Sequence, residues 1–127
     1  MTDMLAIATA AVFALLAGLH FYWAAFGTGK NSAAIPEVNG APAFKPSKAA
    51  TAAVGMALLG VAAIVLLDVK PLLACAAAVL VLRAIGDFRL VGFFKRVRGS
   101  KFARMDTLLY SPLCLALGAA LAALASG

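Results

Sequence analysis

The chain has 127 residues, of which 65% are hydrophobic and only 13% carry a charge. A water-soluble domain is closer to half hydrophobic and a quarter charged, so this composition excludes an ordinary soluble domain. Eleven Lys and Arg residues against five Asp and Glu residues give a net charge of +6. Membrane topology accounts for this positive surplus, and we therefore expect no nucleic-acid partner.

The hydrophobic residues fall into four long segments. At about 1.5 Å per helical residue, crossing a hydrocarbon core of about 30 Å takes about 20 residues. We predict an all-α polytopic membrane protein, a single domain in which four transmembrane helices form a bundle. The predicted spans are residues 4–26, 47–67, 71–90 and 106–125, and the two longer loops are 27–46 and 91–105.

The loop 27–46 follows the first span and contains three prolines, each of which excludes a regular helix. Asn39 and Gly40 form a pair that is typical of a tight turn. We expect a structured loop that acts as a lid, with Pro36, Glu37 and Asn39 as its main residues.

Polar and ionisable side chains interrupt three of the four predicted spans. Counted along each helix, they fall at similar depths in the half of the membrane nearer the long loops. Ionisable residues inside a membrane are costly to keep, and they suggest a functional site. The predicted ligand-binding pocket contains His20, Trp23, Arg83, Asp87, Asp106 and Tyr110.

Arg83 and Asp87 are four positions apart, so on one helix they lie on the same face and are placed to form an ion pair. The cluster has two interpretations. It forms a pocket for a lipid-like or amphiphilic ligand, which the protein binds or carries, or it is a polar network that holds the helices together.

Two further functions stay open. The protein is a small membrane enzyme that acts on a lipid or isoprenoid, with His20, Asp87 or Asp106 as acid and base, although no catalytic residue is identified. Alternatively, it is a structural or assembly subunit or an oligomeric channel. Small residues at i, i+4 spacing, such as Ala49 and Ala53, allow close helix packing within one chain or in a homo-oligomer.

A basic segment follows the third span. We expect Arg89, Lys95, Arg96 and Arg98 to contact lipid headgroups, with membrane lipids as partners. Because the long loops carry nearly all basic residues, the positive-inside rule places these loops in the cytoplasm and both termini on the other side. One histidine and two separated cysteines are too few for a haem or metal site, so no metal and no cofactor is expected.

Several motifs together resemble a known family. They are HFYWA at 20–24, IPEVNG at 35–40, FKP at 44–46, RAIGDFR at 83–89, FFK at 93–95, FAR at 102–104 with Asp106, and YSPLC at 110–114. The chain looks like a group of small bacterial four-helix membrane proteins that is catalogued as a domain of unknown function. This resemblance covers nearly the whole chain and implies a single four-span unit in a bacterial cytoplasmic membrane, but it implies no activity.

Overall fold

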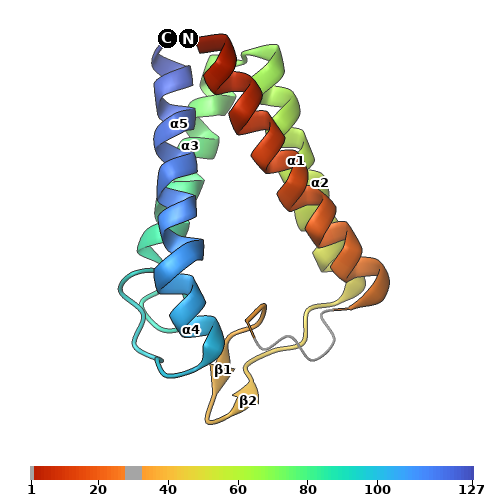
Figure 1. Ribbon diagram of the computed structural model, residues 1–127, viewed down its shortest axis with the longest axis vertical. Coiled ribbons are helices and arrows are strands. Elements are labelled where there is room, and N and C mark those ends of the chain that lie inside the picture. The colour runs from red at the N-terminus through yellow and green to blue at the C-terminus, as the bar shows by residue number, and fades with distance from the viewer. Residues whose placement is uncertain (1, 28–32) are drawn as a thin grey trace. The chain divides into compact units, whose positions relative to one another are not determined.

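The computed structural model describes residues 2–27 and 33–127, and it confirms the all-α class (Figure 1). The described residues form four helices, the last of which runs through three consecutive segments. They are α1 (Thr2–Phe26), α2 (Lys48–Leu67), α3 (Lys70–Ile85), and a continuous helix made of α4 (Lys101–Met105), the π-helical turn η1 (Asp106–Tyr110) and α5 (Ser111–Ser126).

Three of these helices are long and apolar enough to cross a membrane. They cover Asp3–Phe26, Lys48–Leu67 and Lys101–Ser126, so the first, second and fourth predicted spans are helical where expected. The third predicted span, 71–90, is not helical throughout. With 16 residues, α3 rises only about 24 Å, less than the roughly 30 Å of a hydrocarbon core.

A glycine ends α3 earlier than the hydrophobic pattern predicts. Gly86 has a φ of +92°, which is the left-handed conformation that commonly closes a helix. The loop 86–100 then folds back on the helix end, where the Phe93 N–H donates to the Ala84 carbonyl at 2.8 Å. A Cβ atom on Gly86 would lie 1.9 Å from the Val91 carbonyl oxygen, so this close approach requires glycine.

The fourth helix begins earlier than predicted. Ser100 caps its start, and the Ser100 hydroxyl accepts a hydrogen bond from the Ala103 N–H at 3.0 Å. The helix therefore starts about one turn before residue 106, where the fourth span was predicted to begin, because the basic residues that were assigned to the loop continue into the helix. Asp106 consequently lies inside the helix instead of at its end.

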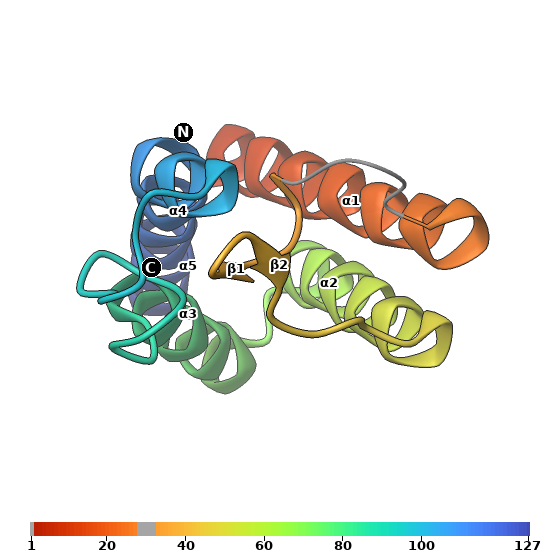
Figure 2. The same ribbon diagram turned by 90° about the horizontal axis from the view of Figure 1, so that it is seen from below.

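The chain divides into two compact units. Unit 1 consists of Met1–Gly27, Pro46–Ala77 and Ala119–Gly127, and unit 2 consists of Thr28–Lys45 and Ala78–Gly118. In unit 1, α1 and α2 lie side by side (Figures 1 and 2). The Phe21 ring covers Gly55, where an added Cβ would lie 2.9 Å from the ring. Ala49 and Ala53, two of the small residues at i, i+4 spacing, are exposed.

In unit 2, the described part of the first loop forms a short hairpin. The strands β1 (Glu37–Val38) and β2 (Ala41–Pro42) pair in an antiparallel manner. Asn39 and Gly40 have φ values of +55° and +79°, the left-handed pair of a tight hairpin turn. The predicted turn is therefore confirmed, whereas residues 28–32 of the predicted loop 27–46 lie outside the described residues.

Candidate functional site

The carboxylate of Asp106 is the centre of a buried polar cluster in unit 2. Asp106 is fully buried. Its Oδ1 accepts from Arg83 Nη2 at 2.8 Å and from the Ser111 hydroxyl at 3.2 Å. Its Oδ2 accepts from the Gly92 N–H at 2.7 Å and pairs with Lys95 Nζ at 3.1 Å. We call these residues, with Thr107, the Asp106 cluster.

The wide turn η1 brings Asp106 and Ser111 together. The Ser111 N–H donates to the carbonyl of Asp106, five residues earlier, and the two side chains meet on the same side of the helix. Pro112 follows directly and has no N–H for a regular helical bond. Wide turns of this kind are frequent at functional sites, and Pro112 is the sequence signal that accompanies this one.

Lys95 was predicted to contact lipid headgroups, and this prediction was wrong. Its side chain is completely buried. Its ammonium group donates to the Gly92 carbonyl at 3.1 Å and to the Thr107 hydroxyl. Together with Asp106, these acceptors draw Lys95 inward and away from the basic residues that surround it in the sequence.

The charges in the Asp106 cluster do not balance. Arg83 and Lys95 are two cations that share one carboxylate, Asp106. Within the described part of the chain, Arg83 Nη1 is buried and has no hydrogen-bond partner. The Arg83 side chain as a whole is 31% exposed. The cluster thus has a net positive charge and one unused donor.

Asp87 does not pair with Arg83 as predicted. Because α3 ends at Ile85, the two residues do not follow one another on a helix face. The Asp87 carboxylate instead accepts from the backbone N–H groups of Arg89, Leu90 and Val91 at 2.9, 2.8 and 3.2 Å. The bond from the Arg89 N–H is the main cause of a lowered pKa at Asp87. Asp87 therefore shapes the loop.

Tyr110 connects the first loop to the fourth helix. Its hydroxyl donates to the Ala33 carbonyl at 2.8 Å, and its ring packs against Phe102 with centroids 5.7 Å apart. Of the predicted lid residues, Pro36 is buried, Glu37 is half-buried and Asn39 is exposed. The loop is thus attached near the cluster, while its action as a lid stays a prediction.

His20 and Trp23 belong to unit 1. The His20 Nδ1 lies 2.7 Å from the Leu16 carbonyl oxygen, one turn earlier on α1. The rings of His20 and Trp23 meet edge to face with centroids 5.1 Å apart. Both residues therefore have partners within their own helix, and their joining of the pocket with Arg83 stays a prediction.

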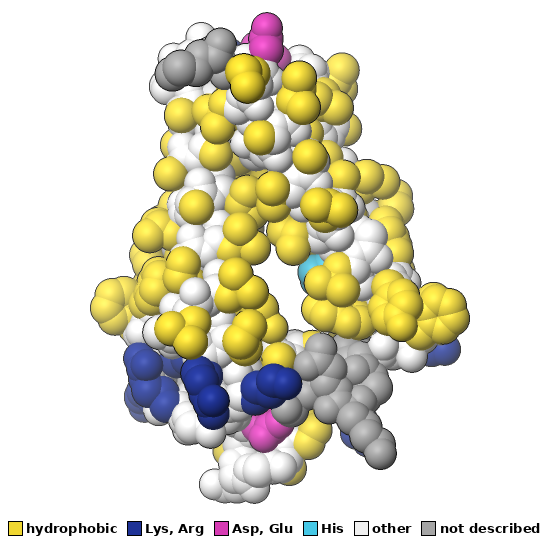
Figure 3. Space-filling view, in the orientation of Figure 1, with side chains coloured by type: hydrophobic (Ala, Val, Ile, Leu, Met, Phe, Trp, Pro, Cys, Tyr) yellow, Lys and Arg dark blue, Asp and Glu magenta, His cyan; other side chains and the backbone are white. Residues whose placement is uncertain are grey.

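The other basic residues predicted to reach headgroups, Arg89, Arg96 and Arg98, are exposed. Arg96 Nε donates to the Phe88 carbonyl at 3.0 Å, and Arg98 Nη2 donates to the Phe93 carbonyl at 2.9 Å. These bonds hold the loop 86–100 in shape. In Figure 3, basic side chains gather at this end of unit 2, next to helices covered by hydrophobic side chains.

Of the cluster, the predicted pocket contained Arg83 and Asp106 but not Gly92, Lys95, Thr107 and Ser111. Lys95 resembles its basic neighbours, and the hydroxyls of Ser111 and Thr107 have no distinctive spacing. In the described residues, no three His, Cys, Asp or Glu side chains come together as a metal site would require.

The comparisons with known proteins agree with the expected family. No curated protein and no solved structure matches the chain. A family model described as "protein of unknown function (DUF3995)" matches residues 13–121, which include parts of the first and last helices, all of α2 and α3, and the whole Asp106 cluster. The chain is therefore a member of this family.

Proposed function

We propose that the protein is a bacterial cytoplasmic-membrane protein that binds an anionic amphiphile at Arg83. The observation that carries this proposal is the charge imbalance of the Asp106 cluster. Arg83 and Lys95 share a single carboxylate, and Arg83 Nη1 has no partner among the described residues.

An anionic group at Arg83 would neutralise the surplus positive charge and give Nη1 a hydrogen-bond acceptor. A buried donor without a partner costs about 1–3 kcal/mol, and more when it carries a charge. A phosphate or carboxylate oxygen at Nη1 would remove this cost and neutralise the surplus charge. Nη1 itself is buried, but 31% of the Arg83 side chain is exposed, so a turn of the guanidinium would bring this nitrogen to such a group.

The apolar part of the ligand would lie along α3. Val79 precedes Arg83 by one helical turn, so the two side chains share a face. Val79 is 61% exposed and Leu82 is 64% exposed. A ligand with its anionic head at Arg83 and a hydrocarbon chain over Val79 fits this arrangement. In this proposal, the hairpin with Pro36 forms the lid.

The orientation in the membrane follows from charge. The loop 86–100 and the first turn of the fourth helix contain most of the basic residues. Since basic loops face the cytoplasm, the cluster would lie in the cytoplasmic leaflet and both termini on the opposite side. Anionic lipids attract basic segments at that surface.

The bonds of the Asp106 carboxylate favour ligand binding over acid–base catalysis as the function of the cluster. Asp106 receives bonds from Arg83, Ser111 and Gly92 as well as the charge of Lys95. A general base would have to give up these bonds to accept a proton.

Arg83→Lys tests the proposal. Lysine keeps a cation for Asp106 but has only one nitrogen, so it cannot bind the carboxylate and a ligand through separate amino groups. We expect the affinity of the Arg83 site for an anionic amphiphile to fall at least about tenfold in the variant, because a hydrogen bond to a charged group is worth about 1.5–3 kcal/mol. The measurement is mass spectrometry of the purified protein in mild detergent, before and after solvent extraction.

Arg89→Lys is the matched control, because Arg89 is exposed and lies outside the cluster. It should retain the amphiphile at the wild-type level. Equal amounts in wild type and Arg83→Lys would exclude Arg83 as the binding residue. Protein that contains no anionic amphiphile, even when purified from native membranes, would contradict the function itself.

A further inference from the structure

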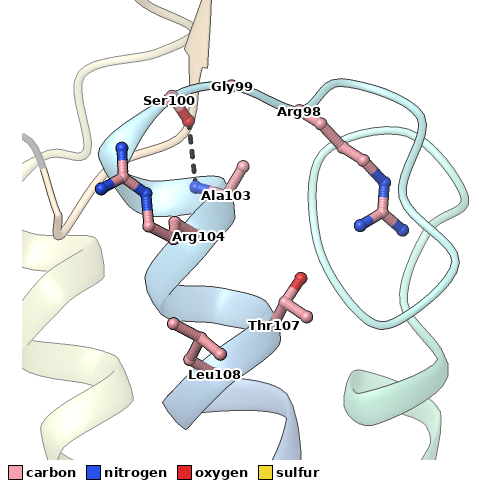
Figure 4. Close-up of a pocket in the computed structure, with 7 residues that line it drawn as sticks. All are labelled: Arg98, Gly99, Ser100, Ala103, Arg104, Thr107 and Leu108. Atoms are coloured by element: carbon pink, nitrogen blue, oxygen red, sulfur yellow. Dashed lines mark hydrogen bonds between the residues drawn. The ribbon is translucent and has the colours of Figure 1, made fainter.

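A second positively charged feature of unit 2 lies at the start of the fourth helix, apart from Arg83. It is a surface cavity of about 300 Å³, a volume at the lower end of the range for small-ligand pockets. Figure 4 shows its lining, with Arg98 on the loop and Arg104 on the helix. The full lining consists of Arg98, Gly99, Ser100, Ala103, Arg104, Thr107 and Leu108.

The two arginines give this cavity its charge. No Asp or Glu residue lines it. Arg98 uses Nε and Nη2 for the carbonyls of Lys95 and Phe93, at 3.2 and 2.9 Å, and its other terminal nitrogen has no hydrogen-bond partner among the described residues. Arg104 is exposed, and its side chain forms no hydrogen bond or ion pair with any described residue.

Thr107 connects the cavity to the Asp106 cluster. Its hydroxyl oxygen accepts from the ammonium group of Lys95. A threonine hydroxyl has one proton of its own to donate, and within the described chain no acceptor takes it. Thr107 can therefore donate this proton into the cavity that it lines, with the positive charge of Lys95 directly behind it.

The far side of the cavity is apolar. Leu108 is 69% exposed, and the adjacent Leu109 is 47% exposed. Both lie on a helix that is apolar enough to cross a membrane. Charged donors at one end and hydrocarbon at the other match a molecule with an anionic head and an acyl chain, and guanidinium forks suit phosphate oxygens.

We propose that this cavity binds the phosphodiester headgroup of an anionic glycerophospholipid. Arg104 holds the phosphate oxygens, Thr107 donates to one of them, and the first part of an acyl chain covers Leu108. Arg98, whose guanidinium points to the other side of the cavity (Figure 4), adds positive charge. The site is separate from Arg83, so it does not depend on the function proposed above.

Arg104→Gln is the main test, because the Arg104 side chain makes no hydrogen bond or ion pair with any described residue. Lys101→Gln is its control: Lys101 is exposed, lies on the same helical turn and is not part of the cavity lining. Both variants lose one positive charge. Binding of phosphatidylglycerol and phosphatidylcholine to the full chain would be measured by lipid titration in native mass spectrometry.

We expect Arg104→Gln to weaken phosphatidylglycerol binding about tenfold, while Lys101→Gln changes it less than twofold and phosphatidylcholine binds weakly to every form. Thr107→Val should also weaken binding, whereas Thr107→Ser should retain it. Equal losses in Arg104→Gln and Lys101→Gln would mean diffuse charge attraction and overturn the proposed site, as would no loss in either.

Two further measurements distinguish a lipid from free phosphate as the ligand, and this cavity from the Arg83 site. One adds inorganic phosphate, and the other uses the variant Arg83→Lys. If the cavity takes a lipid, millimolar inorganic phosphate should compete poorly, because it lacks the acyl chain. Strong binding of inorganic phosphate that requires Arg104 would identify a free phosphate site and contradict the lipid assignment. Arg83→Lys should keep the part of the phosphatidylglycerol binding that requires Arg104, so failure here and failure at Arg83 are distinguishable.

Discussion

Arg83 and Asp106 are 23 positions apart in the chain, yet the guanidinium and the carboxylate meet at 2.8 Å in the interior of unit 2. The pair joins the end of α3 to the wide turn η1. Lys95 shares the same carboxylate from the loop between them. A single acidic residue therefore holds two helices and their connecting loop in position.

Replacing Asp106 should destabilise the protein more than replacing Lys95. Asp106→Asn leaves two cations without a counter-charge, and breaking a buried pair in this way costs about 3 kcal/mol or more. Lys95→Met removes the surplus cation and leaves Arg83 and Asp106 as a balanced pair. Chemical unfolding in mild detergent, followed by circular dichroism, measures both losses.

Asp3→Asn is the control for these two variants, because Asp3 is exposed near the start of α1. It should stay within about 0.5 kcal/mol of wild type. A larger loss in Lys95→Met than in Asp106→Asn would show that the Asp106 carboxylate is not the centre of the cluster.

Gly86 and Gly92 in the loop 86–100 should tolerate no side chain. A Cβ at Gly92 would lie 2.3 Å from the Ile85 carbonyl oxygen, and one at Gly86 would lie 1.9 Å from the Val91 carbonyl oxygen. Both residues also have positive φ. We expect Gly86→Ala and Gly92→Ala each to cost more than about 2 kcal/mol, from strain and from displaced backbone.

Gly60→Ala is the matched substitution within a helix. Nothing lies within 4 Å of a Cβ at Gly60, and alanine is the better helix former by up to about 1 kcal/mol. Gly60→Ala should be neutral or stabilising in the same unfolding measurement. Equal stability of all three variants would contradict the close approach of the loop to the end of α3.

The lowered pKa of Asp87 predicts a dependence on pH. Backbone N–H groups stabilise the ionised carboxylate, the Arg89 N–H most strongly. A carboxyl group with a folded pKa below its unfolded value stabilises the protein above the unfolded pKa, and this contribution is lost as the pH falls through the folded pKa. Because Asp87 is exposed, the contribution should be within about 1 kcal/mol.

The variant Asp87→Asn tests the direction of this pH dependence. The variant should melt below wild type at pH 7, and the difference should shrink as the pH falls below 3.8, the ordinary value for this carboxyl group. A difference that grows on acidification would contradict the role of Asp87 as an acceptor for the loop N–H groups.

Features with local sequence signals were predictable. The Asn39–Gly40 turn and the Ser47 cap of α2 each depend on neighbouring residues, and the structure contains both. The hydrophobic segments similarly placed three long helices. These signals are informative because a few neighbouring residues determine a turn or a helix cap, and the length of one apolar segment determines whether it can cross a membrane.

The candidate site was harder to predict because its contacts are distant in sequence. Helical spacing paired Arg83 with Asp87, whereas Gly86 ends the helix between them. Lys95 has the same neighbours as a headgroup-binding lysine, and only the folded loop brings it to Asp106. Composition could identify the ionisable residues of the site, but the choice of partners depends on where the helices end.

Tyr110 should hold the first loop to the fourth helix. Tyr110→Phe removes only the hydroxyl that donates to the Ala33 carbonyl, a bond worth about 1 kcal/mol. We expect faster hydrogen–deuterium exchange in the hairpin at 37–42 with little change in the helices. Tyr22→Phe is the control, because the exposed hydroxyl of Tyr22 has no partner among the described residues. Unchanged exchange in Tyr110→Phe would mean that the buried Pro36 and its neighbours hold the hairpin without this bond, so the loop would not depend on the helix beside the Asp106 cluster.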